Sequence, residues 1–203
     1  MKFVNRPTVF CSGIAACFFL IVGNVGAADS FRVTDAAVDQ ASVSVGRISK
    51  DQSVHVQLFD STRANLGKPK HLDTAQMLAR SAPHLLAVDI VESLRIAGFS
   101  EVVLDKTPDR SSVEHLVLTG SITELNPGSQ AARAWIGFGA GKSKVCVKGS
   151  VSDQAGNTLA EFSHCRKGLG WGDSGAQMED SAVRVGDSIA KFLTEWADGR
   201  YER

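Results

Sequence analysis

The sequence predicts an α+β fold: a mainly antiparallel sheet of about five strands with two helices packed on it, in the order strand, helix, four strands, helix. Three observations lead to this prediction. Apolar residues recur every three or four positions in two stretches, 73–97 and 179–197. Apolar and polar residues alternate in several shorter stretches. Glycine, proline, asparagine and aspartate separate these stretches, as they do at turns.

The first expected strand is 53–59, and the first helix follows at 73–97. Pro83 should kink or restart that helix, and Gly98 is its natural end. The remaining elements are four strands at 101–104, 115–125, 133–152 and 158–167, and a final helix at 179–197 that ends near Gly199.

The composition fits one compact domain. The chain has 203 residues, 22 basic and 22 acidic side chains, and 43% hydrophobic residues. These values argue against a disordered chain, a polytopic membrane protein and a strongly basic nucleic-acid binder. We divide the chain into a signal peptide at 1–28, a polar lead-in segment at 29–52, and a single α+β domain at 53–198. The segment 29–52 is expected to form either a loose lead-in or an edge strand.

The first 28 residues resemble a secretory signal peptide. Lys2 and Arg6 precede an uncharged, largely apolar stretch that ends in small residues. Cleavage is expected after Ala27 or Ala28, which places the mature chain in the periplasm or at the outer membrane. Two alternatives stay open: lipidation of Cys17, which ends a lipobox-like Ile-Ala-Ala-Cys, and an uncleaved membrane anchor. Export follows under all three readings.

Export leaves two cysteines in the mature domain, Cys146 and Cys165, in an oxidising compartment. They lie in two alternating stretches joined by turn residues. If Asp153 faces Thr158 across this hairpin, Cys146 falls directly opposite Cys165 on the polar face. Such opposed residues approach closely enough for a disulfide. We therefore predict a Cys146–Cys165 bridge.

The motifs of known enzymes fail on spacing or context. The segment 137–143 resembles a phosphate-binding loop, but it lacks the first glycine and leads into a strand instead of a helix. Ser174 lies in a Gly-Asp-Ser-Gly sequence and His164 in Ser-His-Cys, but these two residues are too close in sequence for a trypsin-like protease. The histidines show no metal-ligand spacing. No catalytic residues, metal or cofactor are predicted.

The chain resembles the bacterial domain-of-unknown-function family numbered 4410. The residues that carry the resemblance are the stretch 116–125, Gly128-Ser129, and above all 136–145 with its Gly-Phe-Gly-Ala-Gly sequence. The resemblance extends over about residues 50–197. It implies an exported or lipid-anchored envelope protein without an established activity.

The glycine-rich stretch allows two interpretations. It can be a bulge or bend in a long strand. It can also be a contact surface where a protein partner or the membrane meets an aromatic side chain; the candidate residues are Trp135, Gly137, Phe138, Gly139 and Gly141.

We expect an exported, non-enzymatic envelope module that binds a protein partner, or a second copy of itself, in envelope assembly, transport or stress response. Membrane association is expected if Cys17 is lipidated. The alternatives are a periplasmic protein that binds a small ligand or lipid, and a small serine hydrolase that uses Ser174 and His164.

Overall fold

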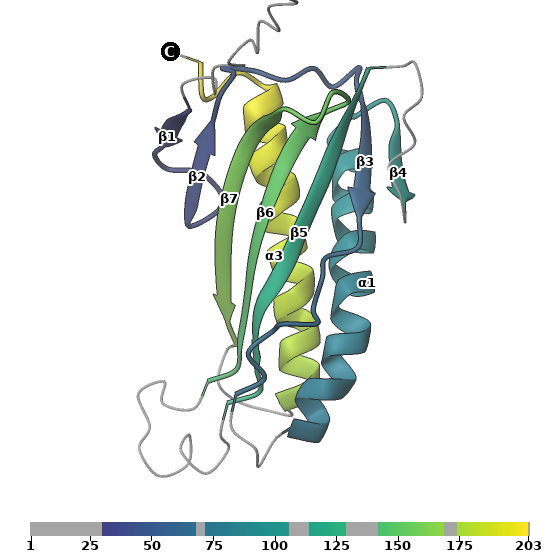
Figure 1. Ribbon diagram of the computed structural model, residues 1–203, viewed down its shortest axis with the longest axis vertical. Coiled ribbons are helices and arrows are strands. Elements are labelled where there is room, and N and C mark those ends of the chain that lie inside the picture. Colours follow the sequence, from purple (N-terminus) through teal and green to yellow (C-terminus); the bar gives the residue numbers. More distant parts are fainter. Residues whose placement is uncertain (1–29, 68–71, 106–113, 129–141, 169–173, 203) are drawn as a thin grey trace, which may run out of the picture.

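The computed structural model describes residues 30–67, 72–105, 114–128, 142–168 and 174–202. These residues form one sheet with two long helices, both on the same face of the sheet (Figure 1). The face without helices is called the outer face below.

The described residues form seven strands and two helices. The strands are β1 (Phe31–Val33), β2 (Gln40–Val43), β3 (Ser53–Gln57), β4 (Val102–Asp105), β5 (His115–Asn126), β6 (Lys144–Asp153) and β7 (Thr158–Lys167). The helices are α1 (Leu72–Ile96) and α3 (Ser174–Ala197). Helix α1 covers β3, β4 and β5, and α3 covers β6 and β7.

The sheet corrects the predicted fold class, which is wrong in strand number and in strand direction. The seven strands lie in the order β1-β2-β7-β6-β5-β3-β4. Along the first part of this order, β1-β2-β7-β6-β5, each strand is antiparallel to the next one. In the second part, β3 is parallel to both of its neighbours, β5 and β4. The sheet is therefore mixed. Helix α1 lies between β3 and β4 in the chain and returns it to the end where β3 began, which makes the two strands parallel.

Two of the seven strands come from the polar segment before residue 53. Strands β1 and β2 have three and four residues, too short to show a clear alternation in the sequence. They join the sheet because β2 pairs with β7, from Gln40 opposite Ser163 to Val43 opposite Ala160. The proposed domain boundaries stay predictions.

Helix α1 continues without a break through Pro83. A proline inside a helix leaves the carbonyl four residues earlier without its usual N–H donor. Here that carbonyl belongs to Ala79, and the Ser61 hydroxyl donates a hydrogen bond to it at 2.6 Å. A side chain from the loop after β3 thus supplies the donor that Pro83 lacks.

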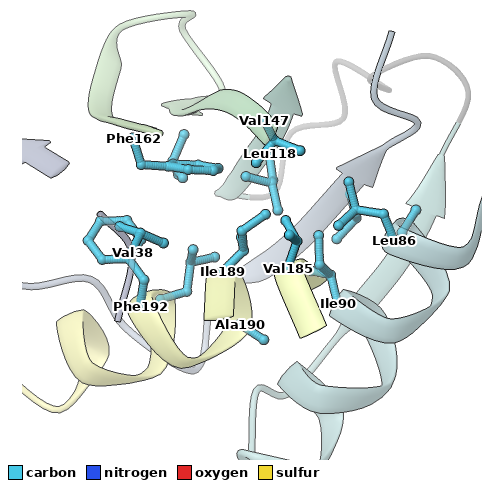
Figure 2. Packing of buried hydrophobic residues seen from close by; sticks show 14 of the residues in the cluster. Val38, Leu86, Ile90, Leu118, Val147, Phe162, Val185, Ile189, Ala190 and Phe192 are labelled. Carbon is cyan, nitrogen blue, oxygen red and sulfur yellow. The ribbon is translucent and has the colours of Figure 1, made fainter. Parts of the chain in front are cut away.

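The core lies between the helices and the sheet. In Figure 2, Val185, Ile189 and Phe192 of α3 point toward residues of the strands, and Leu86 and Ile90 of α1 lie beside them. All five side chains are at most 1% exposed.

Two glycines face each other in the middle of the sheet, Gly120 in β5 and Gly149 in β6. The Phe59 ring packs against Gly120 and the Phe162 ring against Gly149. A Cβ atom added at either glycine would lie within 2.4 Å of the ring it faces. The absence of side chains here lets both rings approach the strands closely.

The described residues form two helices, α1 and α3, and neither combines the length with the apolar composition that a membrane span requires.

Candidate functional site

The two cysteines of the predicted bridge form a disulfide on the outer face of the sheet. Cys146 in β6 lies directly opposite Cys165 in β7, with their Cα atoms 4.1 Å apart. The same register places Gly149 opposite Phe162 and Val151 opposite Ala160. The prediction of this disulfide is confirmed. Only the tip of the hairpin differs: a register shift places Ser152 opposite Thr158, where Asp153 was expected.

A β-bulge in β5 brings an ion pair next to the disulfide. The register shifts between Ile122 and Glu124, so that no residue of β6 is paired with Thr123 in the ladder and Glu124 lies opposite Cys146 on the outer face. A Glu124 carboxylate oxygen lies 2.7 Å from Lys144 Nζ. Without the bulge, the alternation of β5 would turn Glu124 toward the core.

Asp39, immediately before β2, connects the lead-in segment to the disulfide strand. One of its carboxylate oxygens accepts a hydrogen bond from the Cys165 backbone N–H at 2.8 Å. The other lies 3.3 Å from His164 Nδ1, a charge contact that is not aligned as a hydrogen bond. A single carboxylate thus contacts two successive residues of β7.

His164 is on the core side of β7, and its side chain is 7% exposed. Burial lowers the pKa of the imidazole, the Asp39 charge opposes that effect, and Arg166 adds to it. The Nε2 atom is buried and has no hydrogen-bond partner. A neutral, buried imidazole of this kind is a poor candidate for a general base that must reach a substrate.

The hydrolase alternative required Ser174 together with His164. Ser174 is the first residue of α3, and its side chain lies outside the described part of the chain. The histidine half of the pair is buried among core residues. The geometry that the structure describes therefore does not favour hydrolysis at His164.

The predicted contact residues Trp135, Gly137, Phe138, Gly139 and Gly141 lie outside the described residues, as does Cys17. The structure gives no account of them. The described part of the glycine-rich motif is its end, at Lys142 and Ser143.

The outer face carries polar side chains on neighbouring strands. Thr119 of β5 and Ser150 of β6 lie opposite each other with their hydroxyl oxygens 3.2 Å apart. Beside them is a shallow hollow of about 400 Å³. Its polar lining residues are Arg32, Gln40, Ser42, Lys148, Glu161 and Ser163. This surface has hydrogen-bond donors, acceptors and charges of both signs.

Metal-ligating side chains do not gather in the described residues: no group of three or more histidine, cysteine, aspartate or glutamate side chains could hold an ion there. One pair of histidines is close together. The rings of His55 in β3 and His115 in β5 have their centroids 4.7 Å apart, and both side chains are largely buried.

Sequence reasoning missed Asp39, Glu124 and Lys144. Lys144 had one usable signal, since it belongs to the hairpin whose register was predicted. Glu124 had none, because its position depends on the pairing of β5 with β6 and on the bulge in β5. No sequence signal pointed to Asp39, because it lies 126 residues from Cys165, whose backbone N–H donates a hydrogen bond to it.

The fold and this site define a mixed α+β sheet domain closed by a disulfide. Residues 32–172 match a family described as a domain of unknown function, DUF4410, and the chain belongs to that family. No enzymatic family is indicated. No curated protein matches the chain significantly.

Among solved structures, two crystal forms of the PelC dodecamer from Paraburkholderia phytofirmans are similar to the chain, one of them a single-substitution variant. Each has 15% identity and a TM-score of 0.45, and the match covers 70% of this chain and 89% of the PelC chain. A similarity at this level supports no argument about function.

Proposed function

We propose that the protein is an exported, non-enzymatic module of the cell envelope that binds a protein partner in envelope assembly, transport or stress response. The observation that carries the export half of this proposal is the Cys146–Cys165 disulfide. Thiols of cytosolic proteins are kept reduced, whereas disulfides persist in exported proteins. A disulfide is therefore compatible with the periplasmic location that the first 28 residues predict.

The binding half rests on the outer face of the sheet. The two helices cover the opposite face, which leaves the polar side chains of β5, β6 and β7 available at the surface. The buried, uncharged state favoured at His164 supports binding over catalysis.

Mass spectrometry of the protein recovered from the periplasm tests export. We expect a chain that begins at Ala28 or Asp29 and in which Cys146 and Cys165 resist alkylation until a reductant is added. The matched control is the double variant Cys146→Ser/Cys165→Ser, in which no alkylation appears at these positions. Recovery of the full-length, reduced chain from the cytosol would contradict the proposal.

Photo-crosslinking in the periplasm tests partner binding. A crosslinking residue replaces Ser163 or Lys148 on the outer face, and Lys191 on the solvent side of α3 is the matched control. We expect a discrete adduct from the outer-face positions and not from Lys191. A protein that light scattering shows to be monomeric, and that gives no adduct from any position, contradicts a binding role.

A further inference from the structure

Four basic side chains gather where β6 begins and β7 ends: Lys142, Lys144, Arg166 and Lys167. We call this end of the molecule the basic pole. Lys144 lies directly opposite Lys167 in the β6–β7 ladder, and Arg166 lies opposite Val145. Like charges placed directly opposite each other on neighbouring strands destabilise a sheet. The stability of the fold does not account for this arrangement.

Most of this charge is not neutralised. Lys142, Arg166 and Lys167 are exposed, and the described part of the chain gives none of them a carboxylate partner. Lys144 alone pairs with an acid, Glu124.

The far end of the molecule differs. Arg47, Lys50 and Arg200 each contact a carboxylate there, those of Glu202, Asp198 and Glu195 respectively. The formal net charge of the chain is zero, so the unpaired cations of the basic pole reflect an uneven distribution of charge and not a basic protein.

Both helices begin at the end where the basic pole lies (Figure 1). Gly168, next to Lys167, lies close to both Ser143 and Gln177, and Gln177 is in the first turn of α3. A helix N-terminus carries a partial positive charge, and α3 has no acidic residue in its first turn to offset it. Helix α1 has one, Asp73. The dipole of α3 therefore adds to the positive potential of the four side chains, whereas Asp73 offsets that of α1.

Exposed apolar side chains lie at the same end of the molecule, at the start of α1. Met77 and Leu72, in the first two turns of α1, are 70% and 37% exposed. An exposed methionine or leucine near lysine and arginine fits the boundary between lipid headgroups and acyl chains. It fits a purely ionic partner less well.

We propose that the basic pole docks the protein on an anionic lipid surface, with Lys142, Arg166 and Lys167 contacting lipid phosphates and Met77 contacting the acyl boundary. Basic side chains near an anionic membrane attract it additively, and the attraction decreases with ionic strength. This contact is separate from the outer face, so it does not depend on the protein partner proposed above.

Vesicle sedimentation tests this proposal with the mature chain that is recovered after cleavage of a Cys17→Ser precursor, so that neither an acyl group nor the apolar segment 1–28 contributes to binding. We expect binding to vesicles that mix phosphatidylglycerol with phosphatidylcholine, weaker binding at high salt, and much weaker binding to phosphatidylcholine alone. Each basic side chain removed should lower the partition coefficient roughly fivefold. The triple variant Lys142→Gln/Arg166→Gln/Lys167→Gln should therefore lose roughly a hundredfold.

The matched control is Arg32→Gln/Lys148→Gln/Lys191→Gln, which removes the same charge from exposed positions elsewhere. It should keep most of the binding. Circular dichroism and thermal unfolding of both triple variants verify that the fold is intact. Equal losses in the two variants, or equal binding of the parent protein to neutral and anionic vesicles, would overturn the proposal.

Polyglutamate peptide separates a membrane from an acidic protein partner. If the basic pole serves a membrane, Met77→Ser should weaken vesicle binding severalfold, and polyglutamate should compete poorly. Tight polyglutamate binding that requires Lys142, Arg166 and Lys167, with no vesicle binding, would overturn the lipid assignment in favour of an acidic protein.

Discussion

Asp89 of α1 lies where the two helices meet. Its Oδ2 atom is buried without a hydrogen-bond partner and lies against Gly186 of α3, where an added Cβ would approach within 2.4 Å of it. Burial, followed by the charges of Asp187 and Glu92, raises the pKa of Asp89 from 3.8 to about 6. The ionised carboxylate is therefore unfavourable in the folded protein.

Replacing Asp89 with Asn should stabilise the protein at neutral pH. The pKa of Asp89 is higher in the folded than in the unfolded chain, so the folded state binds more protons between about pH 4 and pH 6 and loses stability as the pH rises through that window. At pH 7 we expect D89N to raise the free energy of unfolding by about 1 kcal/mol, allowing for solvent screening of a partly exposed group. Below about pH 4 the difference should vanish.

Urea unfolding of both proteins at the two pH values gives this measurement. Burial lowers the pKa of His164, so that histidine costs stability when the pH falls below about 6.5, but it does so equally in both proteins. The control Glu92→Gln, at an exposed position nearby, should change stability less. A D89N protein that is less stable than the parent at pH 7 would show that the carboxylate is needed.

At the scale of single elements, α1 is a long helix that depends on a loop outside it. The Ser61 hydroxyl donates to the Ala79 carbonyl that Pro83 leaves without a donor. Pro83 itself is buried and packs with the core face of α1. The loop after β3 therefore stabilises the helix in addition to connecting it to the sheet.

A double-mutant cycle should show that Ser61 and Pro83 are coupled. Ser61→Ala leaves the Ala79 carbonyl without a donor, which should lower the free energy of unfolding by about 1–2 kcal/mol. In the Pro83→Ala background the helix supplies its own donor, and Ser61→Ala should then cost less than about 0.5 kcal/mol. Chemical denaturation of the four proteins measures the coupling. Equal costs in both backgrounds would mean that the hydroxyl does not serve this carbonyl.

At the scale of the whole molecule, the disulfide joins the two strands at the middle of the sheet order. On one side, β7 carries β2 and β1, and on the other β6 pairs with β5. The contact of Asp39 with His164 and Cys165 ties the lead-in segment to the same place. One covalent bond between adjacent strands of a hairpin therefore lies where the β1-β2-β7 part of the sheet meets the β6-β5-β3-β4 part.

Removing this bond should destabilise the protein without unfolding it. The disulfide closes a loop with a sequence separation of 19 residues, which corresponds to about 3 kcal/mol of unfolding free energy. We expect this loss in Cys146→Ser/Cys165→Ser and a similar loss when dithiothreitol reduces the parent protein. The double variant should not respond to the reductant. A parent protein whose urea midpoint ignores dithiothreitol would contradict this expectation.

The sequence alone determined the elements whose information is local. The three- to four-residue periodicity located both helices, because one face of each is buried along its whole length. The alternation in β6 and β7, with turn residues between them, determined their register and placed Cys146 opposite Cys165. A hairpin register depends on residues that are close in the chain, so no other part of the fold was needed to predict it.

The tertiary structure decided what depends on residues far apart in the sequence. Strands β1 and β2 are so short and polar that the sequence left a loose lead-in and an edge strand equally open, and the pairing of β2 with β7 decided between them. The sequence did not show that β3 pairs with both β4 and β5, and only these pairings reveal that the three strands run parallel. Asp39 contacts β7 only because folding brings these two segments together. The same holds for the basic pole, which strand ends form beside two helix N-termini.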